Sequence, residues 1–190
     1  AITDNVNFCG LIKFYRKAIA KGIKPIVGTD LWINDPDDDN EVFRIAVLCQ
    51  NNAGYLNAKQ LISRAYQTNQ KLGRPIVEKD WLPEHAEGLI VLSGGREGDV
   101  GRSLVAGNHE QAASQLGFRN LHFPNRYYLE LQRTGRVGEG AYIQAVAGFA
   151  QGSGTPVVAT NDVCFLNQED FDAHEIRVCI NQGRVLDDPR

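Results

Sequence analysis

The stretch Gly88-Leu89-Ile90-Val91-Leu92-Ser93-Gly94-Gly95 decides the fold class of this chain. Residues 89–93 form a short apolar run between glycines, which predicts a buried β-strand. The glycines after it predict a turn, and the apolar spacing that follows predicts helices over residues 100–106 and 110–118. A strand, a turn and a helix in this order form the unit from which α/β folds are built.

The same alternation continues on both sides of this stretch. Residues 8–20 carry apolar side chains at helical spacing, and Gly22 gives a stop signal. The acidic run at residues 35–41 predicts a surface loop. Asp172 and Glu175 have the spacing of a capping box at the start of the last helix. Strands are predicted over residues 25–33, 42–49, 89–93, 127–132 and 156–159, and further helices over residues 53–65, 141–151 and 172–181.

The predicted strands are apolar and show no clear period-two alternation, which favours a mostly parallel sheet covered by helices. Such a sheet is either doubly wound or closed as a barrel, and we expect the barrel, whose chemistry would lie where strands end. Four carboxylates lie at or near predicted strand ends: Asp4, Asp30, Glu130 and Asp162. They could hold a metal ion or act as general acid and base, or they could simply cap turns and helices.

The composition limits the classes of function. The 190 residues, 43% of them hydrophobic, suffice for one domain, which we expect to span residues 1–190. A formal net charge of −3 argues against strong direct binding of DNA, although a local basic patch is compatible with it. Apolar runs are shorter than the roughly 20 residues that span a bilayer. Widely spaced cysteines favour reduced thiols, so we expect a cytoplasmic protein.

Two features could suggest an activity: a glycine-rich stretch like a nucleotide-binding P-loop, and histidines that could bind a metal ion. Neither has the spacing or position that the activity requires. Five residues separate Gly95 from Gly101 where a P-loop has four, and Arg102 replaces the P-loop lysine. We therefore expect a glycine-rich turn that leads into a helix. Metal-dependent hydrolases of this shape recruit several histidines. None of the four histidines lies at a predicted strand end: His85, His109, His122 and His174.

Six short segments, taken in order, carry a resemblance to a known family. They are Ala1-Ile2-Thr3-Asp4, Gly22-Ile23-Lys24-Pro25-Ile26-Val27-Gly28, Asn52-Ala53-Gly54-Tyr55-Leu56-Asn57, Gly88-Leu89-Ile90-Val91-Leu92-Ser93-Gly94, Tyr128-Leu129-Glu130-Leu131-Gln132 and Pro156-Val157-Val158-Ala159-Thr160-Asn161-Asp162-Val163. Together they resemble the PHP (polymerase and histidinol phosphatase) domain of bacterial DNA polymerase III alpha subunits. Residues 171–177 are most similar to the proteobacterial form.

The resemblance implies a distorted (β/α)7 barrel, in which metal ligands at strand ends surround a small metal cluster. The first motif of the family, a His-x-His on the opening strand, would lie upstream of Ala1. We therefore expect a partial domain, truncated at both ends, that lacks the first strand and helix of the barrel. An unpaired strand edge beside Asp4 would then favour self-association of the fragment.

The resemblance also identifies a vestigial pocket that has lost most of its metal ligands. Its positions are Asp4, Asn5, Asp30, Arg44, Gly95, Thr134, Asp162 and Cys164. Metal-binding members of the family have histidine at the positions of Asn5, Arg44, Thr134 and Cys164. They often have cysteine at the position of Gly95. The pocket is therefore expected to hold no metal.

Arg44 is the most informative of these departures. Arginine cannot bind a cation, because it has only hydrogen-bond donors and keeps its positive charge. Asp4 and Asp162 are retained from the family pattern, and Asp30 stands where glutamate is usual. We hypothesise that Arg44 supplies the positive charge that a metal once supplied, by pairing with Asp162, Asp30 or Asp4.

The resemblance implies a part of the DNA-directed DNA polymerase of chromosomal replication, a nucleotidyltransferase whose catalytic aspartates lie in another domain. We expect residues 1–190 to form a non-catalytic scaffold that needs no cofactor and docks the proofreading exonuclease subunit and the rest of the polymerase core. One alternative is a surviving metal-dependent phosphoesterase, a 3'-5' exonuclease or a pyrophosphatase, that would use Asp4, Asp30, Asp162 and Cys164. Another is a free-standing (β/α) enzyme unrelated to polymerases.

Overall fold

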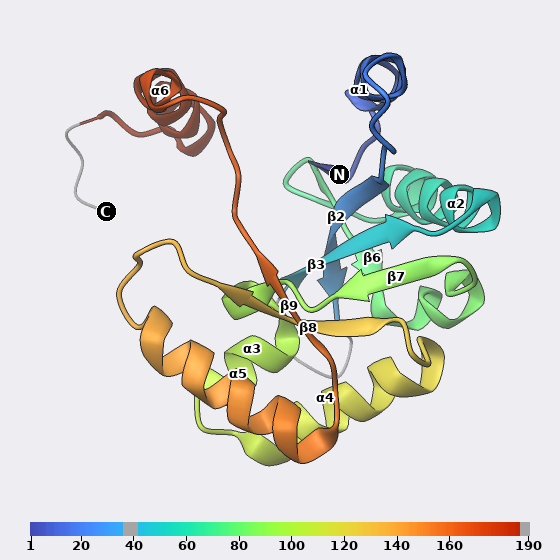
Figure 1. Ribbon diagram of the computed structural model, residues 1–190, viewed down its shortest axis with the longest axis vertical. Coiled ribbons are helices and arrows are strands. Elements are labelled where there is room, and N and C mark those ends of the chain that lie inside the picture. Colours follow the sequence, from blue (N-terminus) through green and yellow to red (C-terminus); the bar gives the residue numbers. More distant parts are fainter. Residues whose placement is uncertain (36–41, 187–190) are drawn as a thin grey trace. The chain divides into compact units, whose positions relative to one another are not determined.

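The computed structural model describes residues 1–35 and 42–186 (Figure 1). The chain divides into two compact units, Ala1–Ala159 and Thr160–Arg190, which are described separately. The expectation of a single domain over residues 1–190 stays a prediction. The predicted acidic loop lies outside the described residues except for Asp35, which is buried and pairs with Lys79 Nζ at 2.5 Å.

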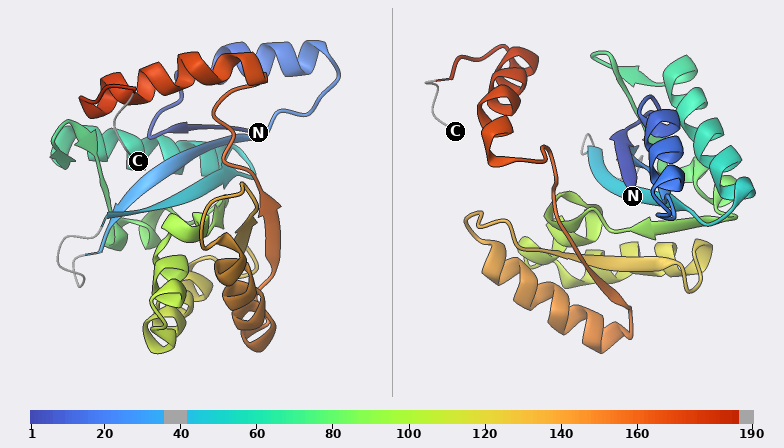
Figure 2. Two further views of the ribbon diagram at one scale, coloured as in Figure 1. Left: turned by 90° about the vertical axis from the view of Figure 1, so that its left-hand side faces the viewer. Right: turned by 45° about the horizontal axis from the view of Figure 1, so that its top comes forward.

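The first unit is built on a curled sheet that resembles half of a barrel (Figures 1 and 2). Its described strands lie in the order β1 (Ile2–Asn5), β2 (Val27–Asn34), β3 (Val42–Cys49), β7 (Leu89–Leu92), β8 (Tyr127–Gln132) and β9 (Val157–Thr160), and β6 (Val77–Glu78) pairs with β2. The α/β class is thereby confirmed. Closure into a seven-stranded barrel and the absence of a first strand and helix stay predictions.

The sheet is mixed. Strand pairs β1–β2, β2–β6 and β7–β8 are parallel, as expected, whereas β3 is antiparallel to both β2 and β7. The sequence interpretation missed this reversal. A parallel pair needs a long crossover, and only residues 35–41 connect β2 to β3, so these strands can pair only as a hairpin. A second hairpin, β4 (Gln70–Lys71) with β5 (Arg74–Pro75), was also missed.

The two faces of the sheet differ, and the expectation of strands without alternation is wrong for β3. Phe43, Ile45 and Val47 are buried, whereas the residues between them are partly exposed. We call the side of Phe43 the covered face and the opposite side the open face. Directly paired residues share a face, so the open face carries Asn5, Asp30, Trp32, Arg44, Ala46, Leu48, Ile90, Leu92, Tyr128, Glu130 and Gln132.

Helices bury the covered face. Helix α2 (Asn52–Thr68) packs on β2, β3 and β7, and α5 (Glu139–Ser153) packs on β8. Helix α3 (Asp99–Val105) lies against α4 (His109–His122) and α5. Helix α1 (Leu11–Ala20) follows β1 and ends before Gly22, whose φ of 70° suits glycine.

In the described part of the second unit, helix α6 (Phe171–Gln182) is preceded by the short helix η4 (Gln168–Asp170). The predicted capping box at Asp172 and Glu175 is wrong. The box is formed by Asn167 and Asp170, because helical turns begin earlier than the apolar spacing suggested. No helix among the described residues of either unit is long and apolar enough to cross a membrane.

Candidate functional site

An arginine on the open face lies between two carboxylates. Arg44 Nη1 lies 3.5 Å from Asp30 Oδ2, and Arg44 Nε lies 3.6 Å from Glu97 Oε2. The side chains of Arg44 and Asp30 are each 19% exposed, and that of Glu97 is 46% exposed. The pairing of Arg44 with Asp30 is one of the three hypothesised from the sequence. Glu97 was missed, because only the fold brings its loop over β3.

Adjacent residues of β1 point to opposite sides of the sheet. Asn5 pairs with Asp30 and shares the open face, whereas Asp4 pairs with Thr29 and points to the other side. There the Asp4 carboxylate accepts a hydrogen bond from the Gly10 backbone N–H at 2.9 Å, just before α1. The fold therefore places Asn5 on the same face as Arg44 and Asp30, and it places Asp4 on the opposite face. Asp30 lies in the middle of β2, not at its end.

A buried glutamate supports the loop after β7. Glu130 Oε2 accepts from the Gly94 N–H at 2.6 Å, and the Glu130 N–H donates to Ser93 Oγ at 2.9 Å. The Tyr142 hydroxyl donates to the Glu130 carbonyl at 2.7 Å. Burial, together with the nearby Glu130 charge, raises the pKa of Tyr142 above its ordinary range. Glu130 thus holds the loop through hydrogen bonds.

The glycines of this loop allow close packing. Gly94 has φ of 77°, and a Cβ there would lie 1.8 Å from the Arg44 carbonyl oxygen. Gly95 has φ of 61°, and a Cβ there would lie 2.7 Å from Gln132 Oε1. A cysteine at position 95 would therefore be strained in this backbone. These contacts support the expected glycine-rich turn into α3.

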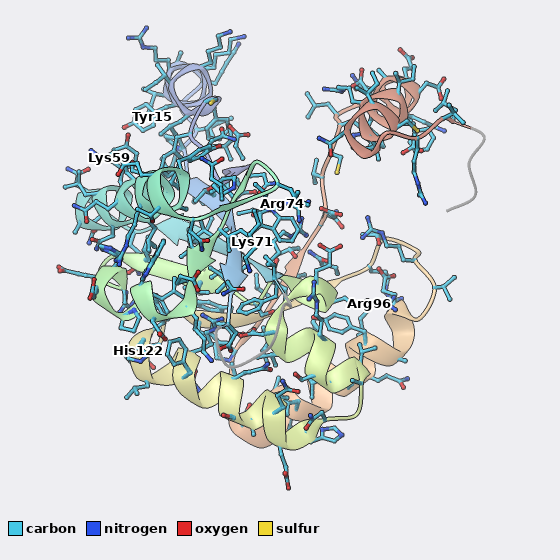
Figure 3. The ribbon with its side chains drawn as sticks, turned by 180° about the vertical axis from the view of Figure 1, so that it is seen from behind. Tyr15, Lys59, Lys71, Arg74, Arg96 and His122 are labelled. Carbon is cyan, nitrogen blue, oxygen red and sulfur yellow. The ribbon has the colours of Figure 1, made fainter. Side chains whose placement is uncertain are left out.

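Thr134 forms hydrogen bonds with the first residue of α5, Glu139. Its N–H and hydroxyl bind Glu139 Oε1 at 2.5 and 3.0 Å. The hydrogen bond from the Thr134 N–H is the main cause that lowers the pKa of Glu139. Nearby, Arg96 Nη1 donates to the Val137 carbonyl at 2.6 Å and links the loop after β7 to the loop before α5 (Figure 3). Thr134 is exposed on this loop.

Asp162 and Cys164 belong to the second unit. Cys164 is exposed, and its Sγ lies 3.7 Å from the Asp162 carbonyl oxygen. The hypothesised pairing of Arg44 with Asp162 therefore stays a prediction.

The side chains of the open face do not fit a metal ion. Among residues 1–35 and 42–186, no three His, Cys, Asp or Glu side chains gather in a way that could hold one. Asp30 and Glu97 could donate oxygen ligands, but the Arg44 guanidinium lies against both. A cation there would be repelled by this permanent charge. The described side chains around Arg44 are arranged as ion pairs.

Comparison with known proteins gives consistent matches. The PHP domain family matches residues 1–134. The whole chain is 52% identical to the DNA polymerase III subunit alpha of Escherichia coli strain K12, 47% identical to that of Vibrio cholerae and 46% identical to that of Pseudomonas aeruginosa, each over 190 residues. The chain spans 16% of the length of each of these relatives.

Proposed function

This chain belongs to the PHP domain family, and from that premise we propose that it is part of the alpha subunit of a bacterial replicative DNA polymerase. The parent protein would be a DNA-directed DNA polymerase that acts in the cytoplasm. Identity of 45–52% along the whole chain to alpha subunits supports this assignment.

Within such a polymerase, we propose that this domain is a non-catalytic scaffold that needs no metal ion. One observation carries the proposal: Arg44 lies between Asp30 and Glu97 on the open face of the sheet. The guanidinium neutralises Asp30, one of the ligands that the phosphoesterase alternative would use, and also Glu97 beside it. It can neither bind a cation nor accept a proton, so Arg44 itself can act neither as a metal ligand nor as a general base.

The scaffold would hold the polymerase core together and dock the proofreading exonuclease subunit. A scaffold requires a stable fold and exposed surfaces for its partners, and it does not require catalytic groups. The packed core beneath the covered face supplies the stable fold.

The test is a binding and hydrolysis experiment on the full-length protein. We expect the exonuclease subunit to co-elute with it equally in EDTA and in Mn²⁺, and a phosphodiester substrate to remain intact when the protein is alone. Hydrolysis that EDTA abolishes and that Asp30→Asn removes would favour the phosphoesterase alternative. Lys59→Gln, a change of an exposed side chain on α2, is the matched control.

A further inference from the structure

Helix α1 and the turn after it carry an unusual concentration of positive charge. Residues 5–29 contain five of the 20 basic side chains and none of the 23 acidic ones, so the other residues hold 15 basic against 23 acidic. The five are Lys13, Arg16, Lys17, Lys21 and Lys24, all exposed. No salt bridge joins any of them to another residue in the described part of the chain. Their charge is available to a partner.

The helix buries only a narrow apolar stripe within its own unit. Leu11, Phe14 and Ala18 recur at three and four residues; Leu11 and Ala18 are buried and Phe14 is half-buried. Because successive side chains turn by about 100°, these residues occupy one side of the helix. That side anchors α1 and leaves the rest of its surface open.

A second apolar stripe lies beside the anchored side and is exposed. Ile12, Tyr15 and Ile19 recur at the same spacing, with exposed fractions of 61%, 47% and 54%, and Ile23, in the turn after the helix, is 62% exposed. Figure 3 shows Tyr15 on α1 and Lys59 on α2. Lys13 and Lys17 follow on the next side of the helix. The exposed surface of α1 is thus apolar along one edge and basic along the other.

We propose that this surface, defined by Ile12, Tyr15, Ile19, Ile23 and the five basic residues, docks an acidic amphipathic helix of a protein partner. The apolar stripe would pack against the apolar side of that helix, and the basic edge would face its carboxylates. This inference rests on α1 alone and does not depend on the scaffold role of the open face.

Other partners explain only part of the surface. Nucleic acid would match the basic edge but would leave three isoleucines exposed to phosphate and water. A second copy that paired α1 with α1 would bring like charges together. An acidic amphipathic helix accounts for both edges at once.

The experiment measures binding to the full-length protein by fluorescence anisotropy. The probe is a synthetic helix of about five turns with leucines at i, i+3, i+4 and i+7 and glutamates beside them. A peptide of the same composition in shuffled order is the control. We expect the amphipathic peptide to bind at least roughly tenfold more tightly than the shuffled one.

Two pairs of variants separate the edges of the surface. Lys13→Glu with Lys17→Glu, and separately Ile12→Ser with Ile19→Ser, should each weaken peptide binding about tenfold or more. Lys59→Glu on α2 should leave binding unchanged, and circular dichroism confirms that each variant is folded. These substitutions concern exposed side chains, so the fold should tolerate them.

Several results would overturn the proposal. Equal binding of the two peptides would show that only charge matters. Tighter binding of single-stranded DNA, duplex DNA or anionic lipid vesicles than of the peptide would assign the surface to that partner. Unchanged binding in the Ile12 and Ile19 variant would remove the apolar stripe from the interface.

Discussion

Two arginines of the first unit hold carboxylates on opposite sides of the same sheet. On the covered side, Arg119 Nη2 lies 2.7 Å from Asp99 Oδ2, and the two side chains are 0% and 3% exposed. On the open face, Arg44 lies 3.5 Å from Asp30, and both side chains are 19% exposed. The same pair of chemical groups is sealed in one place and open to solvent in the other.

The difference in burial sets how much it costs the fold to lose one partner of each pair. Asp99 is held between the Val100 N–H and Arg119, and the Arg119 guanidinium also lies over the Phe43 ring. Removing either partner would leave a buried charge without compensation. Around Arg44, water can reach both groups, so the loss of either one is less costly.

The largest effect should follow from breaking the sealed pair. We expect Arg119→Met to destabilise the fold by about 3–5 kcal/mol, because Asp99 stays buried without its partner. Urea unfolding followed by tryptophan fluorescence measures the change. Asp99→Leu combined with Arg119→Met should recover part of the loss. A loss below about 1 kcal/mol for Arg119→Met would mean that water already compensates Asp99.

The second largest effect should come from a change in the glycine turn that packs against the Arg44 backbone. Gly94→Ala should cost about 3 kcal/mol, because its backbone has a positive φ and the new Cβ would meet the Arg44 carbonyl. Gly107→Ala is a matched control: its φ is 76°, but a Cβ there meets nothing within 4 Å. Its cost should be about 1 kcal/mol, from the backbone alone. If urea unfolding shows equal losses of unfolding free energy for the two variants, the close contact between Gly94 and the Arg44 carbonyl would be contradicted.

The open pair itself should matter less than the sealed one. Arg44→Leu should reduce the free energy of unfolding by about 2 kcal/mol, between the values for surface and buried pairs. Added salt should shrink this loss more than the loss in Arg119→Met, because exposed charges are screened. Unfolding at low and high salt measures both. An unchanged stability in Arg44→Leu would show that the ion pairs of Arg44 with Asp30 and Glu97 do not stabilise the fold.

The smallest effect concerns a thiol on the covered side. Burial raises the pKa of Cys49 from 9.0 to about 11. The folded state keeps its proton more tightly, so this contribution to stability is complete below pH 9 and is lost as the pH rises toward 11. In the wild type, the free energy of unfolding should fall by about 1–2 kcal/mol between pH 9 and pH 11 on account of this thiol, a value reduced because the thiol is partly exposed. Cys49→Ala should abolish this fall. Cys9→Ala, at an exposed thiol, should retain the loss in full.

The sequence predicted most elements because their ends carry strong local signals. The predicted strand at residues 42–49 matches β3, and Gly22 marks the end of α1 as expected. The direction of β3 was missed, because apolar runs do not encode strand direction. The short hairpin of β4 and β5 was missed because it buries little of its surface.

The site was harder to predict because it depends on distant parts of the chain. Arg44 and Asp30 were identified from the family pattern, but Glu97 reaches Arg44 only when the glycine loop folds over β3. The opposite directions of Asp4 and Asn5 follow from strand periodicity, a signal present in the sequence. The buried Arg119 gave no such signal, since its partner Asp99 lies on another helix.

In the proposed scaffold, the Arg44 guanidinium takes the place of a metal ion on the open face. Metal content of the full-length protein, measured by mass spectrometry after dialysis against Mn²⁺ and Zn²⁺, tests it most directly. We predict no stoichiometric metal in the wild type and none in Lys59→Gln. Stoichiometric metal that is lost in Asp30→Asn would contradict the claim and identify a functioning metal site beside Arg44.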